Sequence, residues 1–289
     1  MKLDRMPSCL NTPRFKELSL KVQGAIIVQA CTHTQSHIGS MYLQDHLLLV
    51  VLKGTNTITF GEEKYVVNAG EMILLRKATI INFHKVGDAN QEDIYDCLFF
   101  FLKDEFLSDF VKAVSLKSDI SPDDSRFHIT VASAKDRLIK FFDSVKIYFK
   151  EPEKNIEENL LRLKIIELLY DIAATDENLL SQILLLKNPI QTSIVNVMEE
   201  NFANPVSLSE LAFLSGRSLS SFRRDFQTIY NTSPSSWIKE KRLNKAKELL
   251  LNTSLSVTDV CFMVGFENPS HFSRVYKDFF GCPPSTHAN

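Results

Sequence analysis

A chain of 289 residues, of which 44% are hydrophobic and 24% are charged, exceeds one compact helical domain, so its length predicts two domains. The net charge of −2, from 33 basic and 35 acidic residues, does not decide whether nucleic acid is a partner, because basic charge can be concentrated locally. The longest apolar stretches have about six to nine residues, whereas a membrane-spanning helix needs roughly 20. The amino end also lacks the layout of a signal peptide. We therefore expect a cytoplasmic protein without a membrane partner.

The region from about residue 37 to residue 102 alternates apolar or β-branched runs with turn residues such as Lys53-Gly54 and Gly61-Glu62. This alternation predicts short strands at 47–52, 57–60, 65–67, 72–75, 80–83 and 94–102. Short strands separated by regular turns are typical of a β-sandwich or barrel, so we expect a barrel over about residues 20–110.

The histidines of this region do not indicate a metal site. His33, His37, His46 and His84 include no His-x-His pair, and no third histidine or glutamate is spaced to complete a ligand set. We expect His84 to be a barrel or rim residue, and we expect neither a metal nor a cofactor. No Ser/His/Asp set, glycine-rich phosphate loop or carboxylate pair indicates an enzyme.

The five cysteines, at positions 9, 31, 97, 261 and 282, are odd in number and irregularly spaced. They contain no Cys-x-x-Cys pair that would indicate zinc binding or redox chemistry, so we expect reduced thiols. Cys261 corresponds to Ala212 in the repeat described below, which predicts a small buried residue.

A helical pattern begins near Leu107, with long helices predicted at 134–149 and 156–173 and a further apolar run at 179–186. The apolar stripe of the second helix is wider than one packing face needs. Such an excess indicates either deep burial within its own domain or a subunit interface. We assign residues 1–188 to one domain, with its helices at about 134–187, and expect a short hinge at Lys187-Asn188-Pro189.

A nine-residue pattern occurs twice near the carboxyl end, at 208–216 and again 49 residues later at 257–265. Beyond the two glycines the offset is 50, and it matches Phe222 to Phe272, Arg224 to Arg274 and Pro234 to Pro284. One small structural unit is therefore used twice, with a difference of one residue at its turn.

Each copy predicts a helix, a turn and a second helix. Ser207 and Ser256 are placed as N-caps, and Glu210 and Asp259 bring negative charge to the first turn. Gly216 and Gly265 end the first helix, after which Ser218 and Asn268 start the second. Aromatic residues four apart form the inward face of each second helix: Phe222, Phe226 and Tyr230 in one copy, and Phe272, Tyr276 and Phe280 in the other.

The remaining positions of the two second helices carry side chains suited to base edges and phosphates. They are Ser220, Ser221, Arg223, Arg224 and Gln227 in the first copy, and Ser270, His271, Ser273, Arg274 and Lys277 in the second. One such helix could equally be a solvated face. Two matched copies favour DNA binding, with arginine reading guanine and serine or lysine fixing the register on the backbone.

The segment 234–252 predicts one continuous helix between the two units. Two recognition helices held about 34 Å apart could enter successive major-groove turns on one side of B-DNA. Residues 217–247 contain eight basic side chains against Asp225 and Glu240, so positive charge is concentrated here. The eight are Arg217, Arg223, Arg224, Lys239, Lys241, Arg242, Lys245 and Lys247.

These residues resemble a known family. The pattern Ser218-x-x-x-Phe222-x-Arg224-x-Phe226, then Arg242-Leu243-x-x-Ala246-x-x-Leu249-Leu250, then Phe272-Ser273-Arg274-x-Tyr276-Lys277 is similar to the DNA-binding domain of AraC/XylS-type bacterial transcription regulators. The resemblance covers residues 189–289. It implies seven helices that hold two helix-turn-helix units near a promoter, with Ser220, Arg223 and Arg224 reading DNA in the first and Ser270, His271 and Arg274 in the second.

Two features depart from the family. Asp225 stands where an apolar residue is common, and Gln227 where lysine is common, which implies weaker phosphate contact by the first helix. The chain also ends five residues after Pro284, so the final helix of the family is expected to be short or missing.

The segment Asn68–Leu75 resembles the turn and strand of the cupin barrels found in AraC-type sensor domains. The expected architecture is therefore α+β, with a cupin-like barrel and helices followed by an all-α domain. The resemblance implies a sequence-specific activator that binds promoter DNA and RNA polymerase, is controlled by a small-molecule effector or a protein antagonist, and forms a homodimer. The alternative is a cupin-type enzyme or ligand-binding protein with a fused DNA-binding domain.

Overall fold

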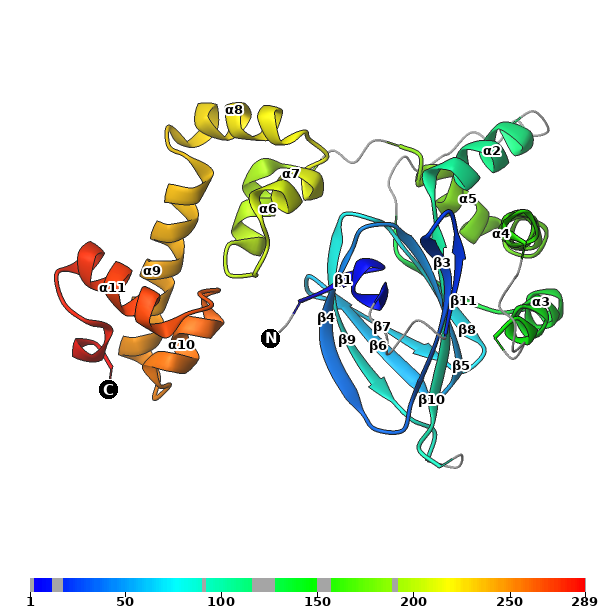
Figure 1. The fold of residues 1–289 in the computed structure, drawn as a ribbon, viewed down its shortest axis with the longest axis horizontal. Helices are drawn as coiled ribbons and strands as arrows, with labels where there is room; N and C mark the ends of the chain where they lie inside the picture. The colour runs from blue at the N-terminus through cyan, green and yellow to red at the C-terminus, as the bar shows by residue number, and fades with distance from the viewer. Residues whose placement is uncertain are drawn as a thin grey trace. The chain divides into compact units, whose positions relative to one another are not determined.

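The computed structural model describes residues 3–11, 18–89, 92–115, 128–149, 157–188 and 192–288. The chain divides into two compact units, a β-rich unit of residues 4–188 and a helical unit of residues 189–289, with which Leu3 is grouped (Figure 1). The expected hinge residue Pro189 lies outside the described residues. The α+β architecture predicted from the sequence is confirmed.

The β-rich unit is built from two sheets. A five-stranded sheet has the order β1-β4-β9-β6-β7, and a six-stranded sheet has the order β11-β8-β5-β10-β3-β2. The strands of the first sheet are β1 (Leu3–Met6), β4 (His37–Leu43), β6 (Thr55–Phe60), β7 (Glu63–Asn68) and β9 (Thr79–Val86). Those of the second are β2 (Ser19–Val22), β3 (Ala25–His33), β5 (His46–Lys53), β8 (Glu71–Leu75), β10 (Tyr95–Leu102) and β11 (Thr130–Ser133).

The central strands β5 and β10 of the six-stranded sheet are apolar along most of their length because both of their faces are buried. Along β10, Cys97, Phe99 and Phe101 pack between the sheets, whereas Phe100 and its alternate neighbours pack against the helices. β5 and β8 alternate in the same way. The sheet therefore separates two apolar cores, one inside the barrel and one beneath the helices.

Four helices cover the outer face of the six-stranded sheet: α2 (Asp104–Ser115), α3 (Asp136–Ile147), α4 (Glu158–Thr175) and α5 (Glu177–Leu185) (Figure 1). The helices predicted at 134–149 and 156–173 correspond to α3 and α4, although residues 150–156 lie outside the described part. On α4, one side carrying Ile165, Leu168 and Ile172 is buried against the sheet and the other helices.

Five strands of this unit were not predicted. β1, β2, β3 and β4 precede or begin the region that we read as strands, and β11 lies beyond the expected end of the barrel at about residue 110. β11 pairs antiparallel with β8, so a strand distant in sequence completes the edge of the sheet.

The helical unit contains α6 (Ile194–Asn201), α7 (Leu208–Leu214), α8 (Leu219–Tyr230), α9 (Pro234–Asn252), α10 (Val257–Met263), α11 (Pro269–Phe280) and the 3-10 turn η2 (Pro284–Thr286). α7 with α8 and α10 with α11 are the two helix-turn-helix units, and α9 runs between them (Figure 1). Among the described residues, the last element is η2, which begins at Pro284.

The first helix of each helix-turn-helix unit begins at the capping residues that the sequence predicted. Ser207 and Glu210 form a capping box at the start of α7, and the Ser256 hydroxyl accepts from the Asp259 backbone N–H at the start of α10. The second helices end alike as well. Asn231 and Gly281, 50 residues apart, adopt left-handed backbone conformations with φ of 52° and 80°.

Candidate nucleic-acid interface

α8 and α11 present equivalent surfaces. The rings of Phe222 and Phe226 are buried on one side of α8, as are those of Phe272 and Tyr276 on α11. Seen down either helix, the arginine 2 residues after the first buried aromatic lies on the opposite side. Arg224 is 76% exposed, and Arg274 is exposed at the same position of the second copy.

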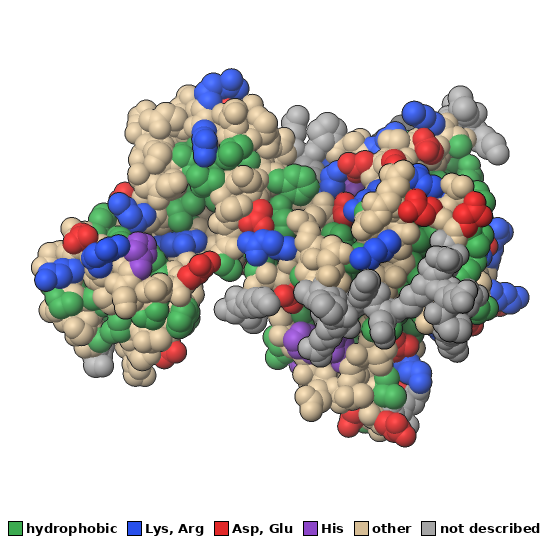
Figure 2. Space-filling model, viewed as in Figure 1, with side chains coloured by type: hydrophobic (Ala, Val, Ile, Leu, Met, Phe, Trp, Pro, Cys, Tyr) green, Lys and Arg blue, Asp and Glu red, His purple; other side chains and the backbone are tan. Residues whose placement is uncertain are grey.

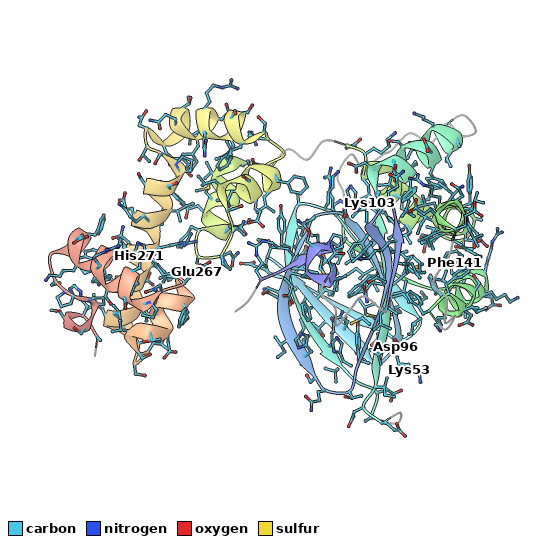
Figure 3. All side chains as sticks on the ribbon, viewed as in Figure 1. Lys53, Asp96, Lys103, Phe141, Glu267 and His271 are labelled. Carbon is cyan, nitrogen blue, oxygen red and sulfur yellow. The ribbon has the colours of Figure 1, made fainter. Side chains whose placement is uncertain are left out.

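Eight of the ten predicted contact residues are exposed, and Ser221 and Ser273 are half-buried. The Ser221 hydroxyl accepts from the hydroxyl of the N-cap Ser218, 3.1 Å away, so this serine takes part in the cap of α8. His271, labelled in Figure 3 near Glu267 of the preceding turn, lies at the start of α11. Its ring centroid is 6.1 Å from that of Phe266.

Asp225 lies between two arginines. Its carboxylate oxygens are 3.3 Å from Arg217 Nε and 3.4 Å from Arg224 Nε. The Arg217 guanidinium also donates to the carbonyl oxygens of Thr192 and Ser215. Arg217 is therefore bound to the protein itself, while Arg224 keeps most of its surface open to a ligand.

The lysines of α9 are bound to different degrees. Lys241 pairs with Glu199 at 2.7 Å and its ammonium lies 4.9 Å from the Trp237 ring centroid, whereas Lys245 pairs with Glu248 on its own helix. Lys239 is exposed and can meet a phosphate. Figure 2 shows basic side chains, in blue, over the helical unit, with a few acidic ones among them.

Arg242 has a role that sequence reasoning missed. Its guanidinium is half-buried and donates to three backbone carbonyl oxygens, of Phe202 at 2.6 Å, Asn204 at 2.9 Å and Gly265 at 2.6 Å. Burial lowers the pKa of this guanidinium from its usual value. The carbonyls belong to the segment between α6 and α7 and to the turn between α10 and α11, so Arg242 connects both helix-turn-helix units to α9.

The eight basic residues of 217–247 are therefore not all available to phosphate. Arg242, and in large part Arg217, donate their hydrogen bonds to backbone carbonyl oxygens within the fold. Without these donors the carbonyls in the turns would be left unpaired. Gly265 fits the same junction tightly. A side chain there would bring its Cβ 2.4 Å from the carbonyl oxygen of Ala203, in a backbone conformation with φ of 89°.

Four histidines of the β-rich unit, His33, His37, His46 and His84, lie in strands. His46 in β5 is fully buried, and its Nδ1 accepts from the Lys77 backbone N–H at 3.2 Å. Burial lowers the pKa of His46 to about 3. Among the described residues, no three His, Cys, Asp or Glu side chains are grouped so that they could hold a metal ion. No helix in the described part of the chain is both long and apolar enough to span a bilayer.

The comparisons with known proteins agree with both units. Residues 211–289 match the helix-turn-helix domain family, and residues 46–182 match the ExsA N-terminal regulatory domain. The virulence regulon transcriptional activator VirF of Yersinia enterocolitica is 29% identical over 242 residues, which cover 82% of this chain and 87% of VirF. The HTH-type transcriptional regulator ExsA of Pseudomonas aeruginosa is 28% identical over 243 residues, which cover 82% of this chain and 83% of ExsA.

Among solved structures, ToxT from Vibrio cholerae matches over 90% of this chain and 97% of its own, with 13% identity and a TM-score of 0.42. Paired helix-turn-helix units that follow a β-rich regulatory domain in the sequence define a DNA-binding transcription regulator. The chain belongs to the AraC/XylS-type family of transcription regulators, as its sequence motifs predicted.

Proposed function

We propose that α8 and α11 read two adjacent major-groove segments of one promoter. The observation that carries this proposal is the equivalent placement of Arg224 and Arg274, each exposed on the side of its helix opposite a buried aromatic pair. Both guanidinium groups are exposed and can form two hydrogen bonds with guanine O6 and N7, although Arg224 Nε also lies 3.4 Å from Asp225. Each helix thereby contributes one base-specific contact.

The neighbouring polar residues have a different task. Ser220, Gln227 and Arg223 on α8, and Ser270 and Lys277 on α11, lie beside the reading arginines, where they meet phosphates or flanking base edges. Ser221 and Ser273 are half-buried and contribute less direct contact, whereas His271 is exposed beside Ser270 at the start of α11. These residues set the register of the protein on the duplex, and the arginines set the sequence.

The β-rich unit is the controlling domain of this proposal. Its match to a regulatory domain supports the assignment of residues 1–188 to regulation by a small-molecule effector or a protein antagonist, and of residues 189–289 to DNA binding. Relatives named as transcriptional activators support an activator that contacts RNA polymerase. Because promoter DNA is its target, the protein acts in the cytoplasm of a bacterial cell.

A homodimer formed through α4 is a second part of the proposal. Leu163, 65% exposed, lies with the partly exposed Leu160 and Tyr170 on one side of α4, opposite the side that is buried against the sheet. An apolar stripe of this kind on a surface helix is typical of a subunit interface. Two copies would then place four recognition helices on one DNA.

The test uses the full-length protein and a duplex that the protein selects from a random pool. Titration of this duplex and of a scrambled one over a salt series should give affinity that falls steeply with salt for both. Arg224→Ala should weaken the selected duplex by about 1–3 kcal/mol and the scrambled duplex less. Lys64→Ala, an exposed change on β7 of the other unit, is the matched control and should change neither.

Failure to select any sequence, or equal loss on both duplexes for Arg224→Ala, would contradict base reading by α8. An affinity that does not depend on salt would contradict DNA binding itself.

A further inference from the structure

A group of polar side chains lies inside one end of the barrel, on two paired strands of the six-stranded sheet and one strand of the five-stranded sheet. It comprises Cys31 and His33 of β3, Lys85 of β9 and Cys97 of β10. Lys85 is 3% exposed, Cys31 is 8% exposed and Cys97 is fully buried. The DNA-binding function uses none of these residues, and the sequence led us to expect ordinary reduced thiols here.

Lys85 has an unusual environment for an ammonium group. Its Nζ lies 3.6 Å from Cys31 Sγ and 3.5 Å from His33 Nε2, and it faces the rings of Phe83 and Phe99. The described residues place no carboxylate within ion-pair distance of it. A buried positive charge needs a nearby anion. The sulfur of Cys31 is the neighbouring atom that can become one.

The surroundings of Cys31 favour its thiolate. The pKa of Cys31 lies well below its usual value, chiefly because of a hydrogen bond from Cys97. Burial of Cys31 raises this pKa, whereas the hydrogen bond with His33 and the positive charge of Lys85 lower it further. The His33 Nε2 is 3.0 Å from Cys31 Sγ. Burial, followed by its interaction with Cys31, raises the pKa of Cys97. Other polar groups near this cluster are the hydroxyl of Tyr95 and the side-chain amide of Asn56, which bond to each other, and the side chains of Asp96 and His37, which interact electrostatically with Cys31.

Cys31 and Cys97 are also placed to bond to each other. They are directly opposite partners in the antiparallel pairing of β3 with β10. The Cα atoms of such partners are about 4.5–5.5 Å apart, which lies within the range that a disulfide spans. One thiol is therefore activated, and a second faces it across the strand pair.

The activated thiol lies close to the surface. The rings of His33 and His37 stack with centroids 5.4 Å apart, and His33 is half-buried whereas His37 is exposed. Figure 2 shows histidine side chains, in purple, gathered at one place on the β-rich unit. His33 therefore lies against both the exposed His37 ring and the Cys31 sulfur, which is 3.0 Å from its Nε2.

We propose that Cys31 and Cys97 form a dithiol site that reacts with hydroperoxides, in which Cys31 is the attacking thiolate and Cys97 is the resolving thiol. The site belongs to the β-rich unit and does not depend on the DNA-binding residues. Its substrate class is hydrogen peroxide or a small alkyl hydroperoxide, because a thiol that is only 8% exposed can be reached by a small molecule alone.

The chemistry balances in two steps. The Cys31 thiolate attacks one peroxide oxygen, the O–O bond breaks, and the leaving alkoxide or hydroxide takes a proton, which yields a sulfenic acid and an alcohol or water. The Cys97 thiol then attacks the Cys31 sulfur, the S–S bond forms, and the departing hydroxide takes the Cys97 proton and becomes water. Two thiols are oxidised to one disulfide, and one peroxide is reduced.

The test compares the cysteines within the full-length protein. Hydrogen peroxide is added at about equal concentration to the protein, remaining thiols are alkylated, and peptides are identified by mass spectrometry. Cys9 and Cys282 are more exposed than Cys31, and Cys261 is buried without a charged neighbour. If exposure alone controls reactivity, Cys9 and Cys282 react first. The proposal requires that Cys31 reacts first and that a Cys31–Cys97 disulfide accumulates.

Two variants separate the roles of the residues. Cys97→Ser should stop the reaction at a Cys31 sulfenic acid that dimedone traps. Lys85→Met, which keeps the aliphatic stem, should lower the rate of Cys31 alkylation at neutral pH by about tenfold. The pH midpoint of Cys31 alkylation should lie below that of Cys282 in the wild type and should rise in Lys85→Met.

Oxidation of Cys9 or Cys282 ahead of Cys31, or a Cys31 midpoint no lower than that of Cys282, would overturn the proposal. Both comparisons are made within the wild-type protein, so they stand even if Lys85→Met does not fold. Accumulation of Cys31 sulfinic acid without the disulfide would overturn the role of Cys97.

Discussion

Single residues decide how the helical unit presents its recognition helices, and Arg242 is the clearest case. From the sequence it is one of several basic residues near a DNA-binding surface. In the structure its three hydrogen bonds connect segments more than 20 residues apart along the chain on either side of α9. No local pattern can reveal such partners, because the carbonyls of Phe202 and Gly265 come from loops that only the fold brings together.

Arg242→Ala should lower the free energy of unfolding of the helical unit by about 2–4 kcal/mol, because three carbonyls lose a charged donor. Arg242→Lys should recover little of this loss, since one ammonium cannot reproduce the planar fork of a guanidinium. Urea unfolding followed by Trp237 fluorescence measures it, because Trp237 is the only tryptophan of the chain and lies in this unit. The exposed Lys239→Ala on the same helix is the control, and an equal effect of both variants would refute the role of Arg242.

His46 makes the β-rich unit sensitive to acid. Its pKa of about 3 in the folded protein lies below the value of about 6.5 in an unfolded chain, so the unfolded chain takes up a proton first as the pH falls. Stability is therefore highest above pH 6.5 and decreases toward pH 3. Between pH 7 and pH 5, protonation of His46 in the unfolded chain should lower the free energy of unfolding of the β-rich unit by about 2 kcal/mol.

Hydrogen exchange of the β5 and β8 amides at both pH values measures this loss. His46→Asn keeps an acceptor for the Lys77 N–H but does not titrate, so its exchange should change less with pH than that of the wild type. His128→Asn, an exposed change, should behave as the wild type does. Parallel pH profiles for His46→Asn and the wild type would contradict this assignment.

At the scale of helices and strands, the sequence predicts best what short-range physics determines. The caps Ser207, Ser218, Ser256 and Asn268 were found because a capping side chain bonds to a backbone N–H three residues away. The exposed positions of α8 and α11 followed from aromatic residues four apart. These local rules fix both recognition helices and the side that each exposes.

Strands at the sheet edges were harder to predict. β11 has four residues and is a strand only because it pairs with β8, more than 50 residues earlier in the chain. β2 and β3, by contrast, left a signal that we did not use. In the sequence, Gly24 is followed closely by a β-branched run, which is typical of a turn before a strand. In the structure, Gln23 and Gly24 both have positive φ in the turn between β2 and β3. A hairpin could have been predicted at that point.

The exposed apolar side of α4 can be tested as a dimer interface. Leu163→Glu should weaken the proposed dimer at least tenfold, because a carboxylate would be buried in an apolar contact, while folding is unaffected at a site that is 65% exposed. Sedimentation of the full-length protein over a range of concentrations measures the change. Val66→Glu, on an exposed apolar residue of β7, is the matched control and should sediment as the wild type does. A wild-type protein that remains monomeric throughout would exclude α4 as an interface.

For the whole molecule, the decisive property is that one continuous helix carries both recognition units. α9 contacts α8 at one end and α10 at the other, and Arg242 bonds to turns on both sides. The two reading arginines should therefore act at a fixed spacing on one duplex, about one helical turn or 10–10.5 base pairs apart. A flexible connection would instead permit several spacings.

Duplexes selected by Arg224→Ala and by Arg274→Ala should each lose base preference at one position, and the two positions should be about 10 base pairs apart. The arginines share no contact, so the double variant should lose binding energy equal to the two single losses within about 0.5 kcal/mol. Sequencing of the selected pools, with titration of the wild-type duplex, measures both quantities. If both variants relaxed the same position, or if the double variant lost no more than one of the single variants, only one helix-turn-helix unit would be reading sequence and α9 would not be setting a distance on DNA.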